Sequence, residues 1–228
     1  MATAVSHPYY PQDSTLKGYV DNDWEVGAIF SIFGASIMAT IAATRALTKS
    51  MNPKLGKKDQ ALAVWFVVSG AIHLVIEGYF SINHRVMPQM QDYLGQGWKE
   101  YSKSDSRYMT AEPFVVCMES VTAFAWGPLC LLTAWMILTG SPWRHATQAL
   151  VSMGQFYGDF LYFTTNTMDY FYNGVSYSRP EALYYWGYFV GINGFWLAIP
   201  GYCVYSSTKE IGRAFGRLRQ LEGSRKVE

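Results

Sequence analysis

The chain has 228 residues and a formal net charge of +1, with 15% charged and 17% aromatic residues. An average soluble domain carries about 25% charged residues, so this balance favours a membrane protein. The near-neutral charge, without a basic run interleaved with aromatic residues, argues against nucleic-acid binding. The three cysteines lie apart inside apolar runs and lack the spacing of a zinc site or a disulfide framework, so we expect no metal.

The N-terminal segment, residues 1–25, has no basic region followed by an apolar core, so we do not expect a cleavable signal peptide. A membrane-spanning helix needs about 20 apolar residues. Five stretches are candidates, at 26–44, 61–82, 114–138, 146–163 and 183–205. The sequence therefore predicts an all-α integral membrane protein, with a five-helix membrane domain at 26–206 and a basic tail at 207–228.

The second stretch holds the most informative pair of residues. His73 and Glu77 lie four residues apart, in a run with no other acidic or basic side chain. Positions i and i+4 share one face of a helix, so the imidazole and the carboxylate are presented together at membrane depth. An acidic residue at the centre of a membrane helix costs about 2.5–3.5 kcal/mol, so it is normally kept only where it faces a partner or a cavity. A histidine beside a carboxylate is suited to acid–base chemistry.

The third stretch carries Glu119 and, three residues later on the same face, Thr122. Its middle contains Gly127 and Pro128. Proline lacks the N–H that a helical hydrogen bond needs, so we expect a kink there.

The fourth stretch is the least apolar, because one face carries a polar stripe at steps of four and three residues. The stripe consists of Gln148, Ser152, Gln155, Asp159 and Tyr162. In lipid, such a stripe must face other helices or a cavity. Hydrogen bonding between helices and the lining of a cavity are equally compatible with the pattern.

The fifth stretch carries Asn193 and, three residues later, Trp196. The predicted helices thus carry two carboxylates, an imidazole, an amide and an indole at similar depth in the membrane. Apolar side chains in their place would let the chain fold in lipid at a lower free-energy cost, so we interpret His73, Glu77, Glu119, Asn193 and Trp196 as parts of one internal site. The aromatic rings of Tyr108, Trp126 and Trp196 would suit a positively charged intermediate, because cations are attracted to aromatic faces. The alternative for each residue alone is structural: a histidine can bond a neighbouring carbonyl, and Trp196 can simply pack.

The distribution of Lys and Arg predicts the orientation. Twelve lie in the loops after the first and third stretches and in the tail, whereas six lie on the opposite side. The positive-inside rule therefore places the C-terminus in the cytosol and the N-terminus across the membrane. The ending Arg225-Lys226-Val227-Glu228 resembles a dibasic retrieval signal of endoplasmic-reticulum membrane proteins.

Several stretches, in order over nearly the whole chain, resemble the emopamil-binding protein family of sterol Δ8-Δ7 isomerases. They are HLVIEGYF (73–80), WKEYSKSDSRY (98–108), VVCMESVTA (115–123), SMGQFYGDFLYF (152–163) and INGFWLAIPG (192–201). The resemblance implies a five-helix endoplasmic-reticulum protein, generally dimeric, whose helices enclose a sterol-sized cavity. It also implies an isomerase of sterol biosynthesis that moves a ring double bond through a carbocation, without a cofactor, and that binds cationic amphiphilic drugs as inhibitors.

Matching the family's motifs makes His73, Glu77 and Glu119 the expected catalytic residues. The expected substrate-binding residues are Tyr108, Met118, Thr122, Asn193 and Trp196, joined by Trp126 from the aromatic wall. The resemblance implies that Asn193 and Thr122 hold the catalytic groups by hydrogen bonds and that Tyr108 helps to close the site. A binding protein of the same fold without catalytic activity is the alternative. A proton-coupled transporter is disfavoured, because the chain shows no inverted repeat.

Overall fold

A computed structural model describes residues 6 to 225. The start of the predicted N-terminal segment, residues 1–5, and the last three residues of the predicted tail and retrieval signal, 226–228, lie outside this described range. Every regular element of residues 6–225 is a helix, as predicted. In chain order these are α1 (Val26–Met51), α2 (Lys57–Ile72), η1 (His73–Glu77), α3 (Gly78–Asn83), η2 (Met87–Gln89), α4 (Tyr93–Tyr101), η3 (Ser106–Tyr108), α5 (Pro113–Val121), η4 (Thr122–Trp126), α6 (Gly127–Thr139), α7 (Arg144–Asn173), η5 (Leu183–Ile192) and α8 (Asn193–Arg225).

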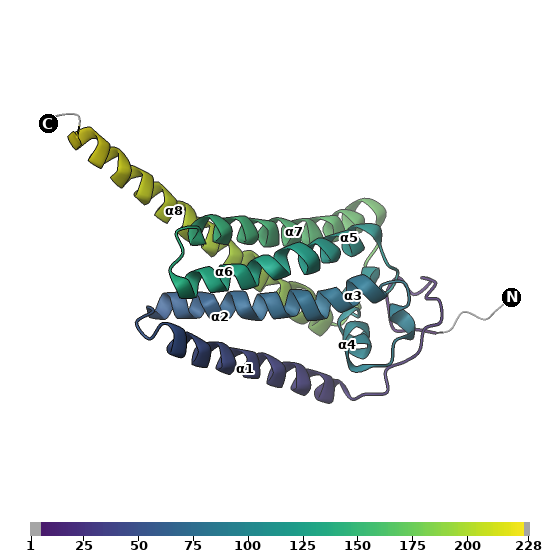
Figure 1. Cartoon of the computed structure of the whole chain (residues 1–228). Coiled ribbons are helices and arrows are strands. Elements are labelled where there is room, and N and C mark those ends of the chain that lie inside the picture. The colour runs from purple at the N-terminus through teal and green to yellow at the C-terminus, as the bar shows by residue number, and fades with distance from the viewer. Residues whose placement is uncertain (1–5, 226–228) are drawn as a thin grey trace.

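Long helical segments run side by side between the two ends of the bundle (Figure 1). They are α1, α2 with η1 and α3, α5 with η4 and α6, α7, and η5 with α8, and each of the five predicted stretches lies within one of them. In the described chain, three segments are apolar and long enough to cross a membrane: Val26–Met51, Lys57–Asn83 and Pro113–Thr139. The other two are less apolar, because α7 carries the polar stripe and η5 is rich in tyrosine and glycine.

The bundle is built on two close helix pairs, α2 with α6 and α7 with α8. Helix α1 forms an outer layer against α2 and α4, and most of its surface is exposed (Figure 1). Gly154 of α7 allows a close approach, because a Cβ there would lie 2.5 Å from the indole ring of Trp126. Gly158, four residues later, faces α5 instead, where a Cβ would lie 3.8 Å from Cγ of Met118.

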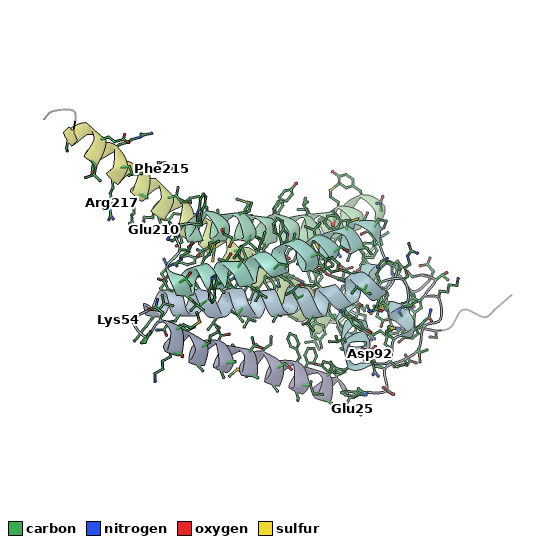
Figure 2. The ribbon with its side chains drawn as sticks, viewed as in Figure 1. Glu25, Lys54, Asp92, Glu210, Phe215 and Arg217 are labelled. Carbon is green, nitrogen blue, oxygen red and sulfur yellow. The ribbon has the colours of Figure 1, made fainter. Side chains whose placement is uncertain are left out.

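The predicted loops gather at two opposite ends. Figure 2 shows Lys54 and Glu210 toward one end and Glu25 and Asp92 toward the other. Residues 207–225 of the predicted tail continue α8 as a helix that projects beyond the bundle, where Phe215 and Arg217 stand clear of the other helices.

The end that holds α4 and η3 is closed by a buried polar network. Arg107 is fully buried and pairs with Asp105 through Nη2 and Oδ2 at 2.6 Å. Nη2 also donates to the carbonyl of Tyr162 at 3.1 Å, and Nη1 donates to the hydroxyl of Thr165 at 2.8 Å, both on α7. The two hydrogen bonds to α7 tie η3 to that helix and so hold the next residue, Tyr108, in the interior.

Two helices widen into π-helical turns where they face each other. The N–H of Gly78 bonds to the carbonyl of His73 in η1, and the N–H of Gly127 bonds to that of Thr122 in η4. The η4 turn ends just before Pro128, which has no N–H to donate to the preceding turn; the kink predicted at Gly127 and Pro128 stays a prediction. The two turns pack closely, since a Cβ at Gly127 would lie 3.3 Å from the Cβ of His73.

Candidate active site

The η1 turn presents His73 and Glu77 as a hydrogen-bonded pair. His73 is only 2% exposed, and its Nδ1 lies 2.5 Å from Oε2 of Glu77. On the other side of the ring, Nε2 lies 2.8 Å from the amide nitrogen of Gln155. The indole of Trp196 packs against the imidazole at a centroid distance of 5.0 Å, with the two rings tilted by 35°. The His73 ring is thus held by Glu77, Gln155 and Trp196.

Glu119 of α5 reaches the same region from the opposite helix. It is 5% exposed, and Oε1 accepts a hydrogen bond of 2.6 Å from the hydroxyl of Tyr108. The Tyr108 ring packs against Trp98 and Phe80 at centroid distances of 4.8 and 5.0 Å. Burial, followed by the nearby Glu119 carboxylate, holds the pKa of Tyr108 well above its usual value. Its hydroxyl therefore keeps its proton and acts as a donor.

These groups converge on one cavity of about 60 Å³. It is lined by His73, Glu77, Tyr108, Met118, Glu119, Thr122, Gln155, Gly158, Asp159, Tyr162, Asn193 and Trp196. The structure therefore brings together all three expected catalytic residues and every expected substrate-binding residue except Trp126.

A second, mainly apolar cavity of about 200 Å³ adjoins the first. Glu77, Tyr108, Glu119, Asn193 and Trp196 line both. The remaining wall comes from α1, α2, η1, α4 and η5, and it includes Ile29, Phe30, Phe33, Ile72, Ile76, Tyr93, Leu94, Gly97, Trp98, Tyr101 and Ile192. The carboxylates of Glu77 and Glu119 thus lie at the boundary between a small cavity with many polar side chains and a larger, mainly apolar one.

Three details differ from the expectations. Trp126 lines neither of these cavities in the described chain and instead packs against Gly154 of α7. Asn193 bonds to the hydroxyl of Tyr101 at 2.8 Å and to the carbonyl of Phe189 at 2.7 Å. Among the side-chain hydrogen bonds of residues 6–225, none joins Asn193 or Thr122 to a catalytic candidate.

The polar stripe of α7 serves both uses that its spacing allows. Gln155, Asp159 and Tyr162 line the small cavity, whereas Gln148 donates to the carbonyl of Cys203 on α8 at 3.5 Å. Asp159 is 9% exposed, and its Oδ2 has no hydrogen-bond partner in the described structure. The sequence signal for Gln155 and Asp159 was their spacing, which did not show that both line the cavity or that Gln155 contacts His73.

The arrangement has the groups that proton transfer requires. Carboxylates and an imidazole hold exchangeable protons, and an apolar cavity beside them can hold an apolar molecule. Aromatic faces next to the carboxylates favour a positive charge between them. Within residues 6–225, no three His, Cys, Asp or Glu side chains are arranged to hold a metal ion.

Comparison with known proteins agrees with this geometry. The sequence profile described as EXPERA (EXPanded EBP superfamily) matches residues 93–207. A 3-beta-hydroxysteroid-Delta(8),Delta(7)-isomerase of Rattus norvegicus is 43% identical over 93% of this chain and 91% of its own length.

Two plant proteins are also similar over most of their length. A probable isomerase of the same name from Oryza sativa subsp. japonica is 33% identical, and a protoglabretal synthase of Ailanthus altissima is 31% identical. Each match covers 92% of this chain and 94% of the plant protein. The chain therefore belongs to the emopamil-binding protein (EBP) family, within the EXPERA superfamily.

Proposed function

We propose that this chain is a sterol Δ8-Δ7 isomerase whose reaction takes place between Glu77 and Glu119. The observation that carries this proposal is the convergence of His73, Glu77 and Glu119 on one buried cavity. The similarity to the rat Delta(8),Delta(7)-isomerase over 93% of the chain supports the same reaction type.

The reaction consists of two proton transfers. An acid of the His73–Glu77 pair gives its proton to C9, so a C9–H bond forms and the electron pair of the double bond leaves a cation at C8. A base then removes a proton from C7, and the electrons of that C–H bond form the new double bond between C7 and C8. One proton enters and one leaves, so the step balances without an oxidant, a reductant or another co-reactant.

Glu119 lies across the cavity from the pair, and we assign it the second acid–base position. Its carboxylate, held by Tyr108, stabilises the cation that forms between the two transfers. Trp196 lines both cavities and adds the attraction of an aromatic face for a positive charge. The rings of the sterol occupy the larger apolar cavity, with α1 as its outer wall.

The wider arrangement forms part of the proposal. All five long helical segments cross the membrane of the endoplasmic reticulum within the domain 26–206 and together enclose a sterol-sized cavity. Residues 1–25 face the lumen, and the tail 207–228 lies in the cytosol. The two ends seen for Lys54 and Glu210 and for Glu25 and Asp92 support this separation (Figure 2). The chain forms a homodimer in the lipid and binds cationic amphiphilic drugs in the substrate cavity.

Purified full-length protein in detergent, supplied with a Δ8 sterol and no cofactor, tests the function. We expect the Δ7 sterol as product, identified by chromatography and mass spectrometry. Glu77→Gln should lose this activity, whereas Gln148→Met, which changes the polar stripe outside the cavity, should keep it. Binding of the sterol without conversion would contradict the proposal and favour a binding protein of the same fold.

A further inference from the structure

Both ring nitrogens of His73 are occupied within the protein. Nδ1 lies 2.5 Å from Glu77, and Nε2 lies 2.8 Å from the amide nitrogen of Gln155. The imidazole therefore offers neither nitrogen to a molecule in the cavity. The carboxylate of Glu77, in contrast, borders both cavities.

The Gln155 amide determines which nitrogen of a neutral His73 carries the proton. An amide nitrogen only donates hydrogen bonds, so Nε2 must accept and the ring proton must sit on Nδ1. The same amide nitrogen lies 3.4 Å from the sulfur of Cys130, a second weak acceptor. Both amide hydrogens thus point at acceptors, while Oε1 of Gln155 is buried without a partner in the described structure.

This tautomer also decides where the acidic proton of Glu77 lies. If Nε2 carried the ring proton, protonated Glu77 would donate to the bare Nδ1, and its proton would be trapped between the two side chains. With the proton on Nδ1, the ring donates to Oε2, so the acidic proton of Glu77 is not used in the bond to His73 and is free to point into the cavity. After that proton has moved to the substrate, the same Nδ1–H bond stabilises the carboxylate left behind.

We propose that Gln155 is a positioning residue, which fixes the Nδ1–H tautomer of His73 and thereby makes Glu77 the acid that touches the substrate. This rests on the proposed function and assigns the proton donor within it. The O–H bond of Glu77 breaks as the C9–H bond of the sterol forms. His73 stays neutral during this step and acts on the substrate only through Glu77.

Nitrogen NMR of the full-length protein with ¹⁵N-labelled histidine reads the tautomer directly. Comparison with His73→Ala identifies the ring signals of His73. We expect a proton on Nδ1 and none on Nε2 in the wild type. A neutral ring with its proton on Nε2 would overturn the inference, and this result needs no variant to fold.

Two substitutions should change the tautomer in different ways. Gln155→Met removes the donor at nearly constant volume, so both tautomers should appear, with kcat lowered about 100-fold and KM changed by less than about threefold. Gln155→Glu replaces the donor by an acceptor, so a proton should appear on Nε2 and activity should fall at least as far. If Gln155 only packed against its neighbours, the two substitutions would not change which ring nitrogen of His73 carries the proton.

Gln148→Met is the matched control, because Gln148 is a buried glutamine of the same stripe that contacts Cys203 rather than His73. It should leave both the His73 signals and kcat unchanged. Gln155→Met with a wild-type tautomer and wild-type kcat would refute the inference. A wild-type chain that has the Nδ1–H tautomer but no isomerase activity would instead refute the proposed function, because the tautomer is read from the protein alone.

Discussion

Replacing Tyr108 by Phe isolates the hydrogen bond that holds Glu119. Tyr108 is 2% exposed, and its hydroxyl lies 2.6 Å from Oε1 of Glu119. The substitution keeps the ring packed between Trp98 and Phe80 and removes only the donor. A hydrogen bond to a charged group contributes about 1.5–3 kcal/mol. If the hydrogen bond holds the Glu119 carboxylate in place while the cation is present, its loss should lower kcat about 10- to 150-fold, because 1.36 kcal/mol corresponds to a tenfold change in rate.

The assay is turnover of a Δ8 sterol at saturating substrate, with the melting temperature of each variant measured in the same detergent. Tyr9→Phe is the control, because Tyr9 is equally buried and donates a hydrogen bond to the Lys99 carbonyl at 2.9 Å, outside both cavities. Tyr9→Phe should lower the melting temperature and leave kcat unchanged. Tyr108→Phe with kcat within about threefold of wild type would refute the role assigned to the Tyr108–Glu119 bond.

Three further predictions follow from the same contacts. His73→Ala, Glu77→Gln and the double variant should lose similar activity in steady-state assays, because groups that act as a unit are not additive; multiplicative losses would indicate independent roles. A sterol-length tertiary amine should inhibit more strongly than its neutral isostere of equal shape, because its ammonium group mimics the cation, and equal inhibition constants would argue against a cation-stabilising site. Gly154→Ala should cost about 1–3 kcal/mol in unfolding free energy, because its Cβ would meet the Trp126 ring at 2.5 Å. Gly34→Ala, with nothing within 4 Å, should be neutral or stabilising by up to about 1 kcal/mol, and equal melting temperatures for the two variants would contradict this packing.

Hydrophobic length was sufficient to predict the five long helical segments, and periodicity predicted which side chains share one face of a helix. The four-residue spacing of His73 and Glu77 survives in the η1 turn, where the two side chains bond to each other. The spacing in the fourth stretch likewise predicted an inward face. Such periodicities depend only on the helix itself, so they are readable without knowledge of the neighbours.

Contacts between helices were not predictable in this way. The partner of His73 is Gln155, 82 positions along the chain, and their meeting depends on how α7 lies against η1. The position of Trp126 was missed for a different reason. A regular helix would place it, seven residues after Glu119, on the face of that carboxylate. The η4 turn closes its hydrogen bond over five residues instead of four, which shifts the register and directs the indole toward Gly154.

Loop residues were also more constrained than charge counting implied. Lys99 and Arg107 were counted among the cations of a loop predicted to be lumenal, yet both are buried at the end of the bundle that holds α4 and η3. Lys99 donates from Nζ to the carbonyl of Val20 at 2.8 Å, and Arg107 pairs with Asp105. Counting charges did not predict this burial, because a buried Lys or Arg and an exposed one are the same residue type in the sequence.

Turnover in heavy water tests the central claim, that a protein acid protonates the double bond, most directly. If Glu77 exchanges its proton with solvent between turnovers, the Δ7 product should carry one deuterium at C9. The label should lie on a single face of the ring, because the acid is held at one place in the cavity. Product that forms at the normal rate without deuterium at C9 would contradict the proton-transfer mechanism.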